Sequence, residues 1–356
     1  MFRGLALVMI FINHVPGNFY EQFTSRNFGF SDAAEAFVFM SGMAAGLAYT
    51  KLFINAPLWP AIARIWGRAR QLYFVHLSIT LMALAIFATA ALYFGAYELL
   101  GKNNLAPIFA HPLQSMIGIP LLTHQLGYLN ILPLYAVLLV ATPLLLPLAL
   151  RWPLPTLGAS ILLWIVAGQF RLNFPNYPNS GGWFFNPFSW QLIFLVGLLC
   201  GSALKQGRSF VPRNRILFAT CSAIVLVVLV WVKVPVVATF FIGGLRWLSD
   251  AGVPFYITWF DKTFLALPRL VHALALFYVL AYLPQIRHFA ASSIAKPLRL
   301  LGRHSLAIFA SGTVLSLALQ AVRVHMKPDV VVDALMMGSG LLLLWGLAFA
   351  LETVKR

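Results

Sequence analysis

Ten apolar segments, separated by short polar stretches, run through this 356-residue chain. A hydrocarbon core about 30 Å thick is crossed by a helix of about 20 apolar residues, because a helix satisfies its own backbone hydrogen bonds. Hydrophobic residues make up 61% of the chain and charged residues 10%, which leaves too few polar side chains to cover a soluble globule. The sequence therefore predicts an all-α polytopic membrane protein, a single domain over residues 1–356. The about ten expected transmembrane helices are 2–17, 33–54, 71–96, 128–150, 156–169, 189–204, 215–233, 268–286, 303–322 and 331–352.

The basic residues indicate how these spans are oriented. When the loops are assigned alternately to two sides, 16 of the 25 Lys and Arg residues fall on one side, which the positive-inside rule makes cytoplasmic. Both termini are then expected in the cytoplasm, and the two longest loops, about 97–127 and 234–267, outside. The net charge of +16 is divided among short separate clusters, so we expect the lipid bilayer and no nucleic acid as a partner.

Metal and disulfide chemistry have little support in the sequence. The eight histidines are scattered without the spacing of metal ligands, so no metal site is predicted. Cys200 and Cys221 both lie in apolar runs, where a cysteine acts as a small core residue. The chain also lacks a Gly-rich phosphate loop and an internal repeat of the kind that builds inverted-repeat transporters.

His14 and Arg3 are the first candidate functional residues. They are 11 residues apart, which places both on one face of a helix and about 16 Å apart along its axis. A titratable group inside a membrane span is costly and indicates a functional site. His14, flanked by Asn13, is a candidate general base, and Arg3 is a candidate phosphate ligand. The alternatives are a packed histidine that bonds a neighbouring helix and an arginine that anchors the cytoplasmic end.

Two carboxylates lie at the start of the second span. Asp32 and Glu35 are three residues apart and share a helix face. One interpretation is purely structural: Asp32 caps the helix, and Glu35 reaches back to the Asp32 amide as in a capping box. The other is catalytic: Glu35, on the span that directly follows His14, orients the imidazole and stabilises its protonated form.

A basic cluster stands before the third expected span. Arg64, Arg68 and Arg70 have the composition of a positive-inside anchor, and they equally suit the phosphates of a nucleotide-like cofactor. His76, six residues further along, lies too deep for an anchor, so we include it with the candidate cofactor-binding residues.

A second polar set lies on the expected outer side. Its tryptophans have two interpretations: residues of an interfacial aromatic belt, or faces for sugar rings, which present apolar C–H groups and hydroxyl edges. Lys262 and Arg269 share a helix face if the segment between them is helical. The candidate substrate-binding residues are Arg26, Asn27, Asn186, Trp190, Gln191, Lys262, Arg269 and His272.

Several motifs resemble those of the OpgC family, inner-membrane proteins implicated in succinylating osmoregulated periplasmic glucans. They are FRGLAL at 2–7, FINHVPGN at 11–18, RNFGFSDAAE at 26–35, VFMSG at 38–42, ILPLY at 131–135, NPFSWQ at 186–191 and LGRHSL at 301–306. More distantly, the chain is similar to the acyltransferase-3 superfamily. The Arg-x10-His pattern of that superfamily falls on Arg3 and His14, and its acidic residue before a Ser-Gly pair falls on Glu35. Its Arg-x-x-Arg motif is replaced by other spacings at 64–70.

The resemblance implies acyl transfer from an acyl-CoA co-substrate, with no permanently bound cofactor. Arg3 and the arginines at 64–70 would hold the CoA phosphates on the cytoplasmic side. His14 would then deprotonate a hydroxyl of a periplasmic glucan or other glycan, with Glu35 or Asp32 orienting the ring. Succinyl as the acyl group, succinyl-CoA as its donor and the bacterial inner membrane as the location rest on the narrower family. The alternative function is a transporter or flippase of a glycan or lipid-linked precursor, which would also embed His, Arg and Glu in the membrane.

Overall fold

The computed structural model describes residues 1–55, 57–327 and 329–354, and these residues are helical with no β-strand. This confirms the predicted all-α class. The helices that form the bundle are α1 (Phe2–Asn13), α2 (Ala33–Asn55), α3 (Leu58–Phe94), α6 (Ile131–Arg151), α7 (Pro153–Gln169), α8 (Pro187–Lys205), α9 (Arg215–Lys233), α12 (Leu267–Tyr282), α13 (Pro284–Ala291), α14 (Lys296–Arg303), α15 (Ser305–Arg323) and α16 (Val330–Val354). The remaining elements are η1 (Phe19–Phe23), η2 (Ser25–Asn27), η3 (Tyr97–Gly101), α4 (Ala106–Ala110), α5 (Pro112–Gly118), α10 (Pro235–Asp250) and α11 (Phe255–Thr258).

The spans agree roughly with the expected ten. Among the described residues, seven helices are long and apolar enough to cross a membrane: α2, α3, α6, α8, α9, α15 and α16. An eighth candidate is the α12–α13 pair, bent by 74° at a short break before Pro284. The remaining two expected spans are the shorter apolar helices α1 and α7. The chain is thus a multi-pass helical membrane protein by the length and composition of its helices.

Three boundaries differ from the sequence prediction. Helix α1 ends at Asn13, four residues early, because Asn18 folds back and donates hydrogen bonds to the Ile12 and Val15 carbonyls at 2.9 and 2.6 Å. Helix α3 begins at Leu58, so its basic cluster lies on the helix itself and not in a loop before it. The expected outer loop at 234–267 contains the 16-residue helix α10.

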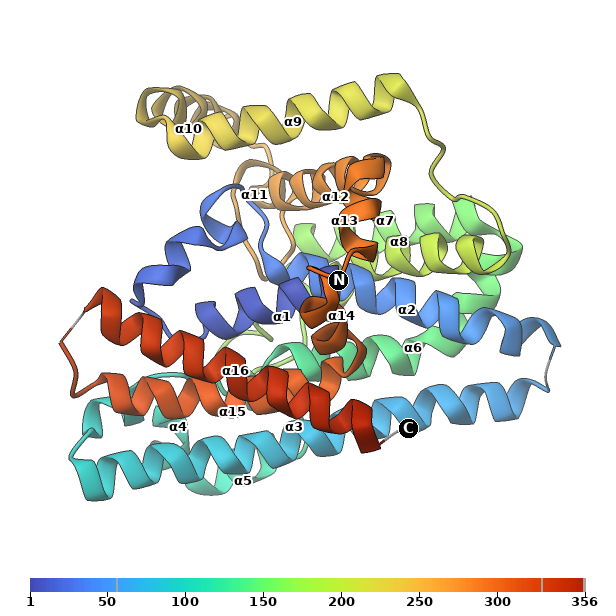
Figure 1. Ribbon diagram of the computed structural model, residues 1–356. Coiled ribbons are helices and arrows are strands. Elements are labelled where there is room, and N and C mark those ends of the chain that lie inside the picture. Colours follow the sequence, from blue (N-terminus) through green and yellow to red (C-terminus); the bar gives the residue numbers. More distant parts are fainter. Residues whose placement is uncertain (56, 328, 355–356) are drawn as a thin grey trace.

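Figure 1 shows that the helix ends gather on two sides of the bundle. The C-terminal ends of α2 and α8 and the N-terminal end of α3 lie at the right edge of the view. The C-terminal ends of α3, α9 and α15 lie at the left edge. The loops at the right edge, which follow α2 and α8, belong to the basic set of loops, so this edge is the expected cytoplasmic side. The N-terminus and α14, which carry other basic residues of that set, lie nearer the middle of the view. The last two basic residues of that set, Lys355 and Arg356, lie outside the described residues.

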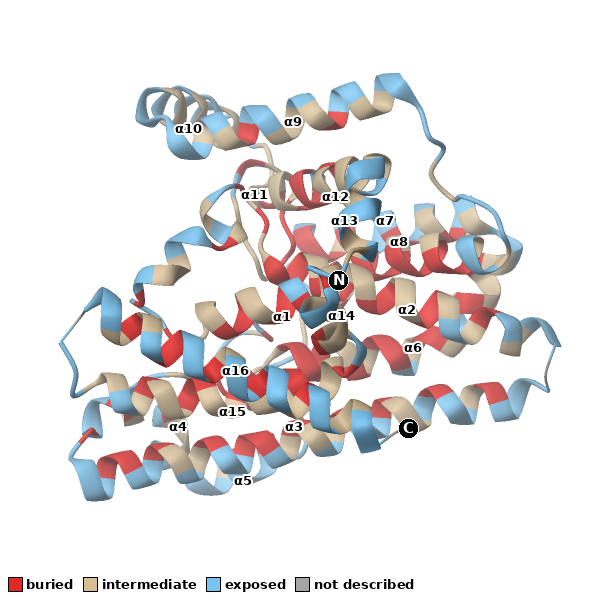
Figure 2. Ribbon diagram, in the orientation of Figure 1, coloured by how far each residue is buried: buried red, intermediate tan, exposed pale blue. Residues whose placement is uncertain are grey.

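The burial pattern suits a protein whose outer surface meets lipid. Figure 2 shows buried residues concentrated where the central helices face one another, and exposed residues along the peripheral helices. Helix α9 is strongly apolar, yet only Cys221 and Val228 of it are buried, and α10 buries no residue at all. Apolar side chains that protein does not cover are stable in hydrocarbon, so these helices fit the rim of a membrane-embedded bundle.

Four glycines hold α2 against α8. Gly42 and Gly46 on α2 face Gly197 and Gly201 on α8, each pair with the small-x-x-x-small spacing of close membrane helix contacts. A Cβ on Gly42 would overlap the Phe194 carbonyl, and one on Gly197 would overlap the Phe39 carbonyl. The two backbones therefore approach until only hydrogen atoms fit between them. This contact fixes α2, the helix that starts at Asp32 and Glu35.

We expect Gly42→Ala and Gly197→Ala to lower the melting temperature of the detergent-purified protein, because each Cβ forces two backbones apart at a cost of about 1–3 kcal/mol. The matched controls are Gly338→Ala and Gly346→Ala on α16, where an added Cβ meets nothing within 4 Å. The controls should match or slightly exceed the wild type, since alanine favours the helix. Equal melting temperatures for both pairs would contradict close packing at the α2–α8 contact.

Candidate functional site

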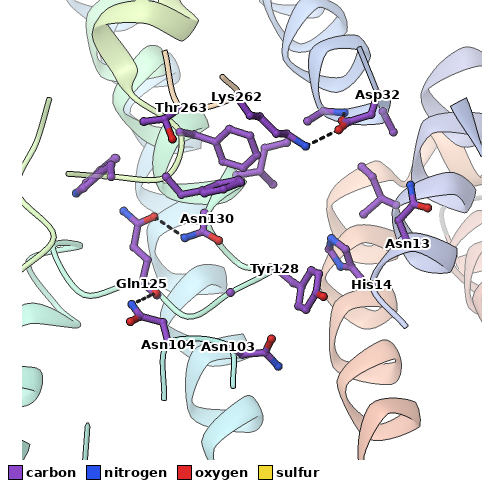
Figure 3. A pocket seen from close by; sticks show the side chains of 18 of the residues that line it. Asn13, His14, Asp32, Asn103, Asn104, Gln125, Tyr128, Asn130, Lys262 and Thr263 are labelled. Atoms are coloured by element: carbon purple, nitrogen blue, oxygen red, sulfur yellow. Dashed lines mark hydrogen bonds and ion pairs between the residues drawn. The ribbon is translucent and has the colours of Figure 1, made fainter. Parts of the chain in front are cut away.

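A cavity of about 770 Å³ opens among segments that are far apart in the sequence. We call it the outer cavity, because its loops belong to the side expected outside. Figure 3 shows polar side chains from several of these segments facing it. It is lined by Ile10, Asn13, His14, Arg26, Asp32, Ala33, Ala34, Asn103, Asn104, Gln125, Gly127, Tyr128, Asn130, Ile131, Asn176, Gly182, Trp183, Phe184, Phe185, Lys262, Thr263, Arg269 and Phe309.

His14 lies in the wall of this cavity at the end of α1. Its ring packs against the Tyr128 ring, with the centroids 4.7 Å apart (Figure 3). Its Nδ1 is buried and finds no hydrogen-bond partner in the described part of the chain. The backbone around it is tied down instead: the Gln320 side chain donates a 2.5 Å hydrogen bond to the His14 carbonyl and accepts one from Asn103 at 3.0 Å. A fixed backbone thus carries an imidazole whose buried Nδ1 has no hydrogen-bond partner among the described residues.

Asn13 stands beside His14 with its amide oriented by one contact. The Thr24 hydroxyl donates to the Asn13 Oδ1 at 2.8 Å. This leaves the amide nitrogen as the available donor of a side chain that lines the cavity.

The two carboxylates form the predicted capping box. The Asp32 Oδ1 accepts the Ala34 amide at 2.8 Å, and the Glu35 Oε2 accepts the Asp32 amide at 2.9 Å. The structural interpretation of this pair is therefore confirmed. The remaining carboxylate oxygens point to cations, and no hydrogen bond joins Glu35 to His14 in the described residues.

Two cations from beyond residue 260 complete a charged cluster with these carboxylates. The Lys262 Nζ lies 2.5 Å from the Asp32 Oδ2, and the Arg269 guanidinium lies 3.3 Å from the same oxygen and 2.6 Å from the Glu35 Oε1. Glu35 is fully buried, whereas Asp32, Lys262 and Arg269 reach the outer cavity. Burial alone would raise the pKa of Asp32, but Lys262 and Arg269 hold that pKa below its ordinary value. Asp32 is therefore an anion at neutral pH.

His272 lies behind this cluster, outside the cavity lining. Its Nδ1 is 2.7 Å from the Ser31 hydroxyl and accepts the Ser31 amide at 3.3 Å. A Cβ on Gly29 would overlap the His272 ring, so the loop before Asp32 passes directly over the imidazole. His272 thus positions the loop that carries Asp32, a different place from the substrate contact expected of it.

The other residues expected to bind substrate divide in two. Arg26 lines the cavity, paired with Glu21 at 3.8 Å, whereas Asn27 is turned to the Glu21 carbonyl. Three more are buried outside the lining. Asn186 caps α8, the Trp190 indole donates to the Lys262 carbonyl at 2.9 Å, and the Gln191 amide is paired with Ser160. Trp190 therefore acts on the cavity through Lys262.

A wall of carboxamides and aromatic rings was missed from the sequence. Asn103, Asn104, Gln125 and Asn130 line one side of the cavity, with Asn176 nearby. Several hold one another: Asn104 donates to the Gln125 carbonyl at 2.9 Å and accepts from Asn179 at 2.7 Å. The aromatic side is Trp183, Phe184 and Phe185. The loop at 97–127 gave little signal, since it holds two asparagines and two aromatic residues, whereas the segment 170–186 is rich in both.

A second, small cavity of about 20 Å³ lies further toward the basic side, and we call it the inner cavity. It is lined by Arg3, Phe37, Ser41, Arg68, Leu72, Leu132, Tyr135, Ser305, Leu306 and Phe309. Arg3 and Arg68 thus converge, as the sequence suggested for two members of the basic set. Arg64 and Arg70 are exposed on α3, and His76 is buried there with both ring nitrogens unpaired among the described residues.

Comparison with known proteins gives one match. The family model described as OpgC protein matches residues 1–356, the whole chain. No curated protein and no solved structure matches. Among the described residues, no group of His, Cys, Asp and Glu is placed to hold a metal ion.

We expect Arg269→Met to destabilise the protein by about 3–5 kcal/mol, because it leaves two carboxylates in a buried site with fewer cations to pair them. Thermal unfolding in detergent measures this. The double variant Arg269→Met/Glu35→Gln should recover part of the loss, since it removes the unpaired buried charge. Arg246→Met, at an exposed position on α10, is the matched control and should unfold like the wild type. An Arg269→Met protein as stable as this control would show that the cluster does not stabilise the fold.

Proposed function

The chain belongs to the OpgC family, and from that membership and the outer cavity we propose that it transfers an acyl group from acyl-CoA to a hydroxyl of a periplasmic glucan. The family indicates a glucan-modifying acyltransferase role. Succinyl is the acyl group that we propose, and the bacterial inner membrane is the proposed location. The observation that carries the proposal is an imidazole, His14, in the wall of a cavity whose lining also includes carboxamides, aromatic rings and the charged groups Arg26, Asp32, Lys262 and Arg269.

The cavity wall suits a sugar acceptor. Carboxamides both donate and accept hydrogen bonds, which matches the hydroxyl edges of a glucan. Aromatic rings such as Trp183 suit the apolar faces of sugar rings, and its indole nitrogen is buried without a partner in the described residues. A cavity of about 770 Å³ falls in the range of small-ligand sites. It therefore fits a short stretch of glucan rather than a whole chain.

The arginines that line the inner cavity suit the donor's phosphates, which would enter once this cavity of about 20 Å³ widens. Arg3 and Arg68 present two guanidinium groups on the basic side of the bundle, and arginine binds phosphate with paired hydrogen bonds. We assign CoA recognition to these two residues in preference to Arg64, Arg70 and His76, which lie outside the lining. Arg3 and His14 are about 16 Å apart along α1, so the donor must extend from one to the other.

His14 performs the proton transfer in this proposal. Its neutral imidazole takes the proton of a glucan hydroxyl while the hydroxyl oxygen attacks the thioester carbonyl carbon. The carbon–sulfur bond then breaks, the ester forms, and the CoA thiolate receives the proton from the imidazolium. The Asn13 amide nitrogen lines the same cavity and can stabilise the negative oxygen of the tetrahedral intermediate.

Asp32 and Glu35 act indirectly in this proposal. Their oxygens are bonded to Lys262 and Arg269, so they fix two cations in the outer cavity rather than orient the imidazole. The four charges of the cluster sum to zero, but Lys262 and Arg269 line the cavity, and their N–H groups can donate hydrogen bonds to a charged acyl group or to the developing negative oxygen.

We expect His14→Ala to lower the rate of glucan-dependent CoA release by on the order of 10²–10⁴, the usual contribution of a general base. The assay uses purified protein, acyl-CoA and glucan, with free CoA measured as thiol. His288→Ala on α13 is the control and should retain the wild-type rate, as it lies outside both cavities. Wild-type turnover in a folded His14→Ala protein would refute the assignment, and no release from any acyl-CoA by the wild type would favour transport.

Variants in the two cavities should affect the KM values of different substrates. We expect Arg68→Gln to raise the KM for acyl-CoA by about tenfold or more, the loss expected for a charge-assisted hydrogen bond, with little change in the KM for glucan. Arg64→Gln and Arg70→Gln are matched controls on the same helix and should have small effects. Trp183→Leu should do the opposite and raise the KM for glucan. If Arg68→Gln alters only the glucan KM, the assignment of the inner cavity to the donor is wrong.

A further inference from the structure

The outer and inner cavities are stacked along the same four helices. On α1, Arg3 lines the inner cavity and Ile10 lines the outer one. On α6, adjacent residues divide between them: Ile131 lines the outer cavity and Leu132 the inner one. Helices α2 and α15 contribute to both cavities in the same way. The two cavities therefore follow one axis through the bundle, from the basic side to the opposite side.

Phe309 is the residue that lines both cavities. It lies on α15, one helical turn after the inner-cavity residue Ser305, and its side chain is almost fully buried. Its ring packs against Phe37 of α2, with the centroids 5.8 Å apart. Since one side chain touches the space on both sides, the barrier at this point is a single layer of aromatic side chains.

We infer that Phe309 is the septum between the two cavities, and that its displacement joins them into one passage through which the donor's thioester arm reaches His14. This inference rests on the proposed function for the identity of the molecule that enters the passage. The assignment of Phe309 as the septum rests on the geometry alone. A side chain that occupies the passage only between turnovers keeps water and ions from crossing. Phe309 is thus a positioning residue and does not take part in the chemistry.

The passage opens more readily by movement of this side chain than by movement of helices. The backbones of α2 and α8 are locked by their glycine contact, and the start of α2 is tied to α12 by the charged cluster. A phenylalanine ring can change rotamer without breaking a hydrogen bond, because it makes none. The inner cavity, about 20 Å³ in volume, holds no more than a water molecule while the ring is in place.

Accessibility of a cysteine in the inner cavity tests the septum. Ser41→Cys, introduced after Cys200 and Cys221 are replaced by alanine, is exposed to a small membrane-impermeant methanethiosulfonate added outside right-side-out vesicles. We expect slow labelling while Phe309 is intact and labelling several-fold faster with Phe309→Ala. Phe87→Ala, which truncates an equally buried ring on α3 outside both cavities, should label as slowly as the parent. Mass spectrometry measures the labelled fraction.

Either of two results would overturn the inference. One is labelling of Ser41→Cys at the same rate in the folded Phe309→Ala and Phe87→Ala proteins, and the other is fast labelling with Phe309 intact. If Phe309→Ala fails to fold, Phe309→Leu, which keeps an apolar side chain, replaces it with the same expectations. Labelling does not depend on acyl transfer. Absence of CoA release would therefore refute the proposed function. The labelling rates would still test whether Phe309 separates the two cavities.

Discussion

The arrangement of the outer cavity depends on pairing buried charge. A carboxylate as buried as Glu35 is stable only with a cation beside it, and Arg269 is that cation. Because Arg269 stands on α12, the pairing brings the start of α2 to a helix more than 230 residues later in the chain. The same carboxylate caps α2 through the Asp32 amide, so helix start and ion pair are set together. Lys262 is then held in the cavity by Asp32.

The secondary structure was largely predictable because the apolar composition of a membrane span identifies it in the sequence. All ten apolar segments correspond to helices, and the loop charges divide the helix ends as Figure 1 shows them. The differences from the prediction arise where tertiary contacts set the end of a helix, or where a helix has an amphipathic sequence. Helix α1 stops early because Asn18 satisfies its last carbonyls, a contact that hydropathy does not register. Helix α10 is a helix of mixed polarity, and its glycines and charges resemble those of a loop.

The site was predictable where the chemistry depends on residues within one helix. The spacing of Arg3 and His14 places both on one face of α1, where Arg3 lines the inner cavity and His14 the outer one, and the capping box at Asp32 and Glu35 is local too. The carboxamide wall could not be found this way, since it forms only when the loop after α3 folds back. There, Asn103 and Asn104 adopt left-handed backbone conformations that asparagine tolerates.

Residue type alone also misjudged Trp190 and Gln191. Both residue types suit a sugar subsite, but Trp190 donates to the Lys262 carbonyl in the loop before α12, and Gln191 bonds Ser160 on α7. A polar side chain in a span is as often a structural hydrogen-bond partner. The side of a helix that such residues occupy is decided by packing, and the close α2–α8 contact depends on Gly42 and Gly197, which no chemical motif singles out.

The central claim is that an acyl group passes between two cavities on opposite sides of the membrane. Liposomes that contain the protein, with acyl-labelled acyl-CoA inside and glucan outside, test this most directly. The account predicts labelled acyl ester on the external glucan, while the released CoA stays inside in equal amount. Labelled glucan that appears only when acyl-CoA and glucan share the same side would contradict it.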